Sequence, residues 1–261
     1  MSKTVLALVP HPDDAEFFAG GTLANMINDG ARAFIVIATD GRKGSFKHDS
    51  ETLARLRAQE AHRAAEALGA EPPILLDHPD TEVDRLPTGV LREQFVCLIR
   101  QHRPDVLIAQ DPFMPLEMHP DHRAVAWAAS EAVNCANLPL VHPEHLVEGL
   151  EPHFVVEKYF YTTDASSANK IVDISHTLET KLAALAEHES QIAFLVEGVS
   201  RQAQAAGLDL KATFGGALDD PLTALTWAVK AQAAQVGELG GVGFGEAFRY
   251  ARFDPLIEAL L

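Results

Sequence analysis

The sequence predicts an α/β fold: a Rossmann-like, three-layer sandwich whose central sheet is mostly parallel. Short apolar runs rich in β-branched residues alternate with longer segments in which apolar residues recur at helical spacing. Strands that alternate with helices form right-handed crossovers, which build a doubly wound sheet. In addition, 261 residues of which 47% are hydrophobic are enough for one large core. We therefore expect one domain over residues 1–261, with a core in 1–136 that 137–261 completes.

Each strand and helix of the first half has its own signal. The run AFIVIA at 33–38 is continuous and rich in β-branched residues, which is typical of a parallel strand buried on both faces. The segment 51–68 has helical spacing and is followed by Gly69, and glycine is favoured just after the end of a helix. The expected strands are 5–9, 33–38, 74–76 and 106–109, and the expected helices are 17–27, 51–68, 89–102 and 124–136.

The second half is less regular. Prolines mark an irregular excursion over 137–154. The elements expected after it are a strand at 155–161, a long helix at 174–194, a helix near 221–236 and a glycine-rich turn in GELGGVGFGEAF. The segment 200–220 contains several glycines and two aspartates before a proline, so we interpret it as a lid or an insertion loop.

Composition and charge restrict the partners. Thirty-seven acidic against 21 basic residues give a formal charge of −16, which repels polyanions. We therefore expect no nucleic-acid and no membrane partner, and a neutral or cationic small molecule instead. The sequence has no stretch of 18 apolar residues that predicts a membrane-spanning helix, and its first apolar run is too short for a secretory signal. These features predict a cytoplasmic protein.

The first motif, His11-Pro12-Asp13-Asp14, lies where the first strand passes into the first helix. Ligands of an open α/β sheet bind at the carboxyl ends of its strands. His11 and Asp14 are three residues apart, so a helical turn that begins at Pro12 lets both side chains converge on one point. Zinc accepts histidine nitrogen and carboxylate oxygen, and a catalytic zinc keeps an open position for water. Asp13 then points elsewhere and is free to take a proton from that water.

A second motif, His119-Pro120-Asp121-His122, repeats this setting after the strand at 106–109. Its two histidines are again three residues apart, so either or both can face the first motif, and spacing does not choose between them. One further ligand leaves an open, catalytic site, whereas two close it and indicate a structural metal. We favour one, because the other histidine can then stabilise a developing oxyanion while a carboxylate such as Asp121 holds it.

Each motif alone also fits a helix N-terminus with a solvated acidic first turn. Two His-Pro-Asp clusters, each at the end of a predicted parallel strand, are much harder to explain as helix caps. We therefore interpret the pair as one metal site.

At these residues the sequence resembles the LmbE-like family, also called the PIG-L de-N-acetylase family. The similarity extends over nearly the whole chain. The matching segments are HPDDAEFFAGGTLA at 11–24, IATDGRKGS at 37–45, RAQEAHRAAEALG at 57–69, RPDVLIAQDP at 103–112, HPDHRA at 119–124, VDIS at 172–175, KLAALAEHESQ at 181–191 and GEAFR at 245–249.

The resemblance implies a metal set and an activity. It implies that His11, Asp14 and His122 bind one Zn²⁺ ion per chain and that Asp13 is the general base. The activity it implies is removal of the N-acetyl group from an N-acetylglucosamine-type amino sugar, with release of acetate and a free amine. It also implies a homo-oligomer, commonly a hexamer.

The same resemblance also implies roles for His119 and Asp121 in the second motif. It implies that His119, oriented by Asp121, stabilises the tetrahedral intermediate or protonates the departing amine. Some relatives carry a Tyr two residues before the first histidine of this motif, where this chain has Glu117. The chain therefore departs from the pattern that brings a Tyr to the oxyanion.

Three further residues are candidate substrate contacts. Arg57 resembles a family position that contacts the sugar, and His188 resembles one near the site. Asp80 follows the third strand at the sheet edge, where a sugar hydroxyl can lie. Each also has an ordinary explanation. An Arg on an amphipathic helix is commonly solvated, an Asp favours turns, and a His on a helix is usually structural.

Two other classes of function compete with the deacetylase. One is a non-catalytic sugar-binding or scaffold protein with a structural metal, which the intact set of ligands and catalytic candidates argues against. The other is a metal-dependent hydrolase of another amide or of a phosphoester, and the motifs lack a basic phosphate cradle for the latter. Gly20-Gly21 lacks a complete dinucleotide motif, so we interpret these glycines as a site of close packing.

Overall fold

The structure is a computed structural model that describes residues 2–210, 220–253, 255–258 and 260. Within these residues one seven-stranded sheet has the order β3-β2-β1-β4-β5-β7-β6. Its strands are β1 Thr4–Val9, β2 Arg32–Thr39, β3 Ile74–His78, β4 Val106–Gln110, β5 Glu157–Tyr161, β6 Lys170–Asp173 and β7 Gly245–Ala251. The first five in this order are parallel, and β7 runs antiparallel to both β5 and β6. The predicted α/β class with a mostly parallel sheet is thus confirmed.

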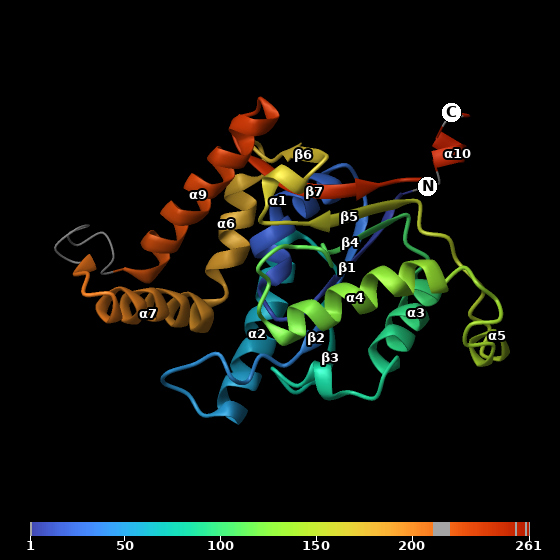
Figure 1. The fold of residues 1–261 in the computed structure, drawn as a ribbon, viewed down its shortest axis with the longest axis horizontal. Helices are drawn as coiled ribbons and strands as arrows, with labels where there is room; N and C mark the ends of the chain where they lie inside the picture. Colours follow the sequence, from blue (N-terminus) through green and yellow to red (C-terminus); the bar gives the residue numbers. More distant parts are fainter. Residues whose placement is uncertain (1, 211–219, 254, 259, 261) are drawn as a thin grey trace.

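Helices cover both faces of the sheet (Figure 1). They are α1 Asp14–Asn28, α2 Ser50–Leu68, α3 Val90–His102, α4 Pro120–Cys135, α5 Glu144–Val147, α6 Leu178–Ala186, α7 Glu189–Ala205, α9 Pro221–Gly240 and α10 Pro255–Glu258. Single 3-10 turns cover Val83–Arg85 and Ala165–Ser167.

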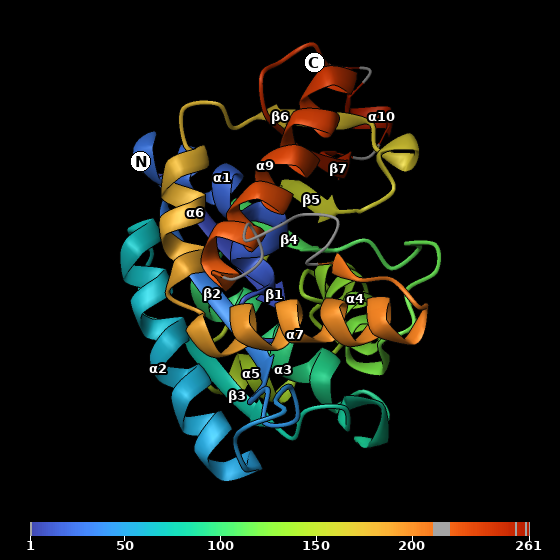
Figure 2. The same cartoon turned by 90° about the vertical axis from the view of Figure 1, so that its left-hand side faces the viewer.

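Alternate residues of β1 divide the core into two layers. Val5, Ala7 and Val9 pack with residues of α1, α2 and α6, whereas Leu6 and Leu8 pack with α3 and α4 on the other face. Figure 2 shows the two groups of helices on opposite sides of the strands. Burial on both faces explains why β1, β2 and β4 are largely continuous apolar runs in the sequence.

The ends of α2 follow from local chemistry. The Asp49 side chain accepts a hydrogen bond from the backbone N–H of Thr52, with 2.9 Å between the two atoms, and so caps the first turn. Gly69 ends the helix with φ of 78°, a left-handed conformation that glycine adopts without strain. The glycine predicted to end this helix is confirmed.

Close packing at the glycine pair of α1 is also confirmed. A Cβ atom at Gly21 would lie 2.7 Å from Cβ of Ile174, so only a glycine lets these segments approach. We expect Gly21→Ala to lower the free energy of unfolding by about 1–2 kcal/mol, because overpacking outweighs the roughly 1 kcal/mol that Ala gains in a helix. Gly198→Ala in α7 is the control. It has open space around it and should stabilise the protein. Equal denaturation midpoints for Gly21→Ala and wild type would contradict this prediction.

The long helix predicted at 174–194 is wrong. Residues 170–173 form β6, and the helical segment is divided into α6 and α7 at His188. Asp173 accepts hydrogen bonds from the backbone and hydroxyl of Ser175, at 2.9 and 2.6 Å, which turns the chain out of β6. His188 leaves the helical region with φ of −86° and ψ of 52°, and its side chain is buried.

The glycine-rich turn predicted near the C-terminus is too long, because β7 begins within it at Gly245. A Cβ atom at Gly245 would lie 2.7 Å from Cγ2 of Ile171 in the neighbouring strand, so the glycine serves a close approach within the sheet. Of the predicted lid at 200–220, residues up to Ala205 belong to α7, and 211–219 lie outside the described residues.

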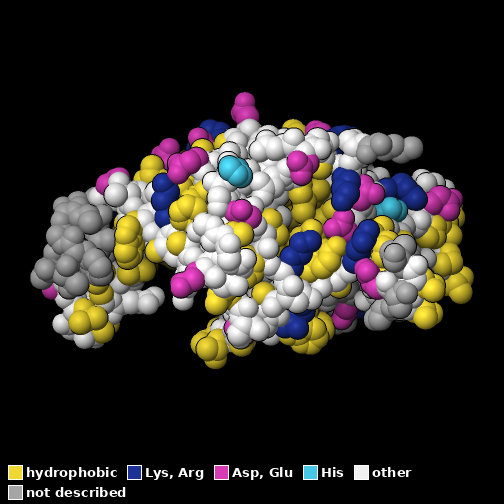
Figure 3. Space-filling model, turned by 90° about the horizontal axis from the view of Figure 1, so that it is seen from above, with side chains coloured by type: hydrophobic (Ala, Val, Ile, Leu, Met, Phe, Trp, Pro, Cys, Tyr) yellow, Lys and Arg dark blue, Asp and Glu magenta, His cyan; other side chains and the backbone are white. Residues whose placement is uncertain are grey.

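One face of the described residues carries charged side chains of both signs (Figure 3). On the face seen in Figure 3, acidic and basic side chains are both present, and basic ones gather on the right-hand half beside exposed hydrophobic side chains. Among the described residues, no helix combines the length and apolar character needed to cross a membrane.

Candidate metal centre

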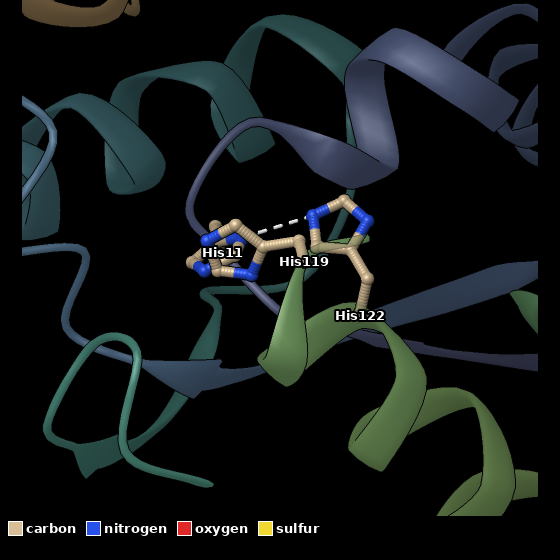
Figure 4. Close-up of side chains that lie close together, drawn as sticks. All are labelled: His11, His119 and His122. Atoms are coloured by element: carbon tan, nitrogen blue, oxygen red, sulfur yellow. Dashed lines mark hydrogen bonds between the residues drawn. The ribbon is translucent and has the colours of Figure 1, made fainter. Parts of the chain in front are cut away.

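The two His-Pro-Asp motifs meet because β1 and β4 are neighbours in the sheet. The first motif directly follows β1, and the second begins α4 after the loop that leaves β4. The chain leaves β1 toward β2 on one side, while β4 lies on the other side, so the strand order reverses between β1 and β4. Such a reversal opens a crevice at the carboxyl ends of the strands. Figure 4 shows the rings of three histidines gathered at the start of α4.

Three side-chain atoms from the two motifs form a compact triangle. Nδ1 of His11 lies 3.1 Å from Nε2 of His122 and 3.3 Å from Oδ2 of Asp14. The third side, from Nε2 of His122 to Oδ2 of Asp14, measures 3.6 Å. Ligand atoms bound tetrahedrally to zinc at their usual bond lengths lie about 3.3–3.6 Å apart. The structure therefore places these three side chains as ligands of one metal ion would be placed.

Two carboxylates contact the outer nitrogen of His11. Nε2 of this ring lies 3.2 Å from Oδ2 of Asp121 and 3.3 Å from Oδ1 of Asp80. Asp121 is itself fixed by the backbone N–H groups of Thr81 and Val83, at 2.6 and 3.2 Å. Burial lowers the pKa of His11, but hydrogen bonds with nearby carboxylates, that of Asp121 above all, outweigh it and raise the pKa well above its usual value.

Asp14 and Asp13 are adjacent buried carboxyls with opposite pKa shifts. Burial raises the pKa of Asp14, but the nearby His122 and His11 lower it more, so the net shift is downward. Burial raises the pKa of Asp13 to about 6, even though Arg57, with its guanidinium 3.1 Å away, acts in the opposite direction. A carboxyl whose pKa is raised to about 6, beside this triangle, is suited to exchange protons.

The backbone of Asp13 is strained. Its φ of 129° is rare for a residue other than glycine, and it is the residue just before α1. Its side chain contacts the Arg57 guanidinium at 3.1 Å, and its place outside the ligand set stays a prediction. Backbone strain of this kind is concentrated at functional sites.

His119 borders the triangle without being part of it. Its ring lies edge-on to that of His11, with 4.7 Å between centroids. Its Nδ1 accepts a hydrogen bond from the backbone N–H of Asp121, at 3.3 Å, so Asp121 contacts His119 through its backbone. Burial and the two neighbouring histidines lower the pKa of His119. Nitrogens of His11, His119 and His122 also lie within 4.8 Å of one another.

The three candidate substrate contacts are all buried in the structure. Arg57 donates to the backbone carbonyls of Pro12 and Gly41 as well as to Asp13. Asp80 accepts a hydrogen bond from the backbone of Lys43. His188 lies with Nε2 3.4 Å from a carboxylate oxygen of Glu16. All three therefore lie against neighbouring residues of the protein, and their contact with a sugar stays a prediction.

Two residues at the site have little signal in the sequence. Glu117 lies with Oε2 3.2 Å from Nδ1 of His122, and its only mark in the sequence is its place two residues before His119. Tyr161 ends β5, stacks on Phe18, and has a buried hydroxyl without a hydrogen-bond partner among the described residues. Its proximity to the site depends on the pairing of β5 with β4, which local sequence does not reveal.

Fold and site together define an α/β protein with a candidate metal centre at the carboxyl edge of its sheet. The chain belongs to the PIG-L family: the family model described as PIG-L, GlcNAc-PI de-N-acetylase, matches residues 6–133. Diacetylchitobiose deacetylase of Thermococcus kodakarensis is 38% identical over 191 residues, which cover 72% of this chain and 70% of that protein.

Two further similarities agree with this membership. A probable N-acetyl-alpha-D-glucosaminyl L-malate deacetylase of Bacillus cereus is 25% identical over 206 residues, which cover 76% of this chain and 87% of that protein. The solved structure of N,N'-diacetylchitobiose deacetylase from Pyrococcus horikoshii superposes with a TM-score of 0.79 at 30% identity, covering 98% of this chain and 88% of that one.

Proposed function

We propose that this protein is a zinc-dependent hydrolase that removes the N-acetyl group from an N-acetylglucosamine-type amino sugar. The observation that carries the proposal is the triangle of His11, Asp14 and His122, with sides of 3.1–3.6 Å, beside a carboxyl that is not part of it. The names of the deacetylase relatives support the class of substrate.

The donor set fits zinc. Two imidazole nitrogens and one carboxylate oxygen are ligands that zinc prefers, and three protein ligands leave the fourth tetrahedral position open. Bound there, zinc supplies a Lewis acid that polarises the acetamide carbonyl and lowers the pKa of water.

The residues of the chain handle the protons. The Asp13 carboxylate accepts a proton from the attacking water as the water oxygen bonds to the acetyl carbon and forms a tetrahedral oxyanion. Asp13 then gives this proton to the nitrogen, so the C–N bond breaks when the tetrahedral species collapses to acetate and the free amine. Arg57 orients Asp13 through the 3.1 Å contact between its guanidinium and Oδ1. With a pKa of about 6, Asp13 is mostly deprotonated at neutral pH and is still basic enough to accept the proton.

His119 stabilises the oxyanion in this proposal. Because its Nδ1 accepts the backbone N–H of Asp121, a neutral ring carries its proton on Nε2. The lowered pKa of His119 keeps the ring neutral near pH 7. Nε2–H is then a hydrogen-bond donor for the negative oxygen that forms when water attacks the carbonyl.

His119→Asn should lower kcat by about 10²–10³-fold, the loss that follows removal of one oxyanion donor. Asn still accepts the hydrogen bond that caps α4, so the helix should be retained. Zinc affinity should stay close to wild type, because the proposed ligand on α4 is His122. A variant that binds zinc much more weakly would make His119 a ligand instead.

The test of the function is acetate release by the purified, zinc-loaded protein. The substrates are diacetylchitobiose and N-acetylglucosamine linked to malate or to inositol, after the relatives. Release from at least one supports the proposal. Zinc bound without any acetate release would instead favour the non-catalytic sugar-binding or scaffold protein. A homo-oligomer and a cytoplasmic location stay predictions from the sequence.

A further inference from the structure

Glu117, in the loop between β4 and α4, is held from two sides. Its Oε1 accepts a hydrogen bond from the backbone N–H of His119, at 2.8 Å. Its Oε2 accepts one from the side-chain amide of Gln110, at 3.1 Å, and Gln110 is completely buried at the end of β4. The carboxylate therefore has a fixed position at the site, although an exposed loop carries it.

The same Oε2 faces the outer nitrogen of His122. It lies 3.2 Å from Nδ1, and both side chains are about 15% exposed or less. The two atoms do not form a hydrogen bond in the structure, and Nδ1 of His122 is buried without a hydrogen-bond partner among the described residues. In Figure 4 one ring nitrogen of His122 faces His11 and the other points away from it.

When the site binds a metal, Nδ1 of His122 requires a hydrogen-bond acceptor. If Nε2 of His122 offers its lone pair to zinc, the neutral ring must carry its proton on Nδ1. A buried N–H without an acceptor is costly, and the Glu117 carboxylate is an acceptor at hydrogen-bond distance.

We propose that Glu117 is a positioning residue for zinc, accepting Nδ1–H of His122 and thereby fixing the tautomer and orientation of that ring. This inference rests on the proposed metal site. It makes Glu117 the counterpart, on His122, of the carboxylates of Asp121 and Asp80 on the outer nitrogen of His11. Carboxylate partners of this kind raise the basicity of a histidine ligand and strengthen metal binding.

Glu117→Gln separates this role from a purely structural one. The Gln carbonyl can still accept the His119 backbone N–H, so the loop keeps its anchor. The side-chain NH2 group of the Gln, however, takes the place of Oε2 and faces two other donors, His122 Nδ1–H and the amide of Gln110. It cannot accept a hydrogen bond from either of them. We expect zinc to bind about 10–100-fold more weakly, the usual loss when a partner of a histidine ligand is removed.

Glu131→Gln is the matched control. Glu131 is also a glutamate, lies in α4, and pairs at the surface with Arg92 at 2.8 Å. The substitution removes the same charge from the same region without touching the metal triangle. It should leave zinc affinity within twofold of wild type.

The experiment measures zinc dissociation constants of the full chain by competition with a chelator. Two further readouts are the absorption spectrum of the Co²⁺-loaded protein and the melting temperature of the metal-free protein. A 10–100-fold weaker affinity, a changed Co²⁺ spectrum and an unchanged metal-free melting temperature support the proposal.

Two results would overturn the proposal. One is a zinc affinity for Glu117→Gln within twofold of wild type. The other is an affinity loss that accompanies a lower metal-free melting temperature and an unchanged Co²⁺ spectrum, because Glu117 then only supports the fold. Wild-type protein that binds zinc but releases no acetate contradicts the deacetylase alone, whereas wild-type protein that does not bind zinc contradicts both.

Discussion

Asp13→Asn is expected to bind zinc as wild type does and to have a kcat about 10²–10⁴-fold lower, which is the usual contribution of a positioned general base. The amide cannot accept the proton of the attacking water, whereas its shape and its oxygen still suit the 3.1 Å contact with Arg57. Asn also tolerates a positive φ better than most residues, so the φ of 129° should be retained. Acetate release and bound zinc, measured on the same preparation, check both parts.

A control for this variant lies at the opposite edge of the sheet. Asp105 precedes β4, and its Oδ2 accepts the backbone N–H of Thr4 at 2.8 Å. Asp105→Asn makes the same chemical change far from the metal triangle and keeps an acceptor for Thr4, so its activity should match wild type. A fully active Asp13→Asn would remove Asp13 from the mechanism and leave the proton without an assigned acceptor.

The sequence predicts the first half of the fold well because β1, β2 and β4 are parallel strands buried on both faces, and the edge strand β3 still begins with a short apolar run. Each run lies between helices of clear spacing, so periodicity alone finds β1, β2, β3 and β4. In the second half, β6 is only four residues long and β7 begins with a glycine. These two segments are strands because they pair with each other. Such pairing depends on the tertiary structure and cannot be predicted from a local sequence pattern.

The three proposed metal ligands also differ in how far the sequence predicts them. The spacing of His11 and Asp14 indicates that they converge, since local chain geometry sets it. Spacing does not choose between His119 and His122, and the family resemblance makes that choice. In the structure the side chain of His122 completes the triangle, while His119 caps α4.

The partners around the triangle depend on loops that meet only in the folded chain. The resemblance implies that Asp121 orients His119. In the structure the Asp121 backbone N–H contacts His119, while its carboxylate contacts His11 and the backbone of Thr81. Those contacts depend on how the loop after β3 lies over the start of α4. Likewise, Glu117 reaches His122 only because Gln110 and the His119 backbone hold its carboxylate. The order of residues in the sequence does not indicate either of these contacts.

Asp14→Asn makes the same chemical change as Asp13→Asn one residue further along, and the expected result is the opposite: zinc is lost together with activity. Oδ2 of Asp14 lies 3.3 Å from Nδ1 of His11 and 3.6 Å from Nε2 of His122, and the downward shift of its pKa keeps it anionic. A neutral amide leaves zinc with two neutral nitrogens. We expect the affinity to fall by more than about 100-fold, beyond the loss of an outer partner.

Thermal unfolding with and without zinc measures this loss independently of catalysis. At a zinc concentration about 100 times the wild-type dissociation constant, binding stabilises the wild type by about 2.7 kcal/mol. A 100-fold weaker variant gains only about 0.4 kcal/mol under the same conditions, so its zinc-dependent rise in melting temperature should almost vanish. The amide oxygen can still accept the His11 backbone N–H, which lies 2.8 Å from Oδ2, so the metal-free fold should be kept. If Asp14→Asn were stabilised as strongly as wild type, Asp14 would not be a ligand, and the set His11, His119 and His122 would take its place.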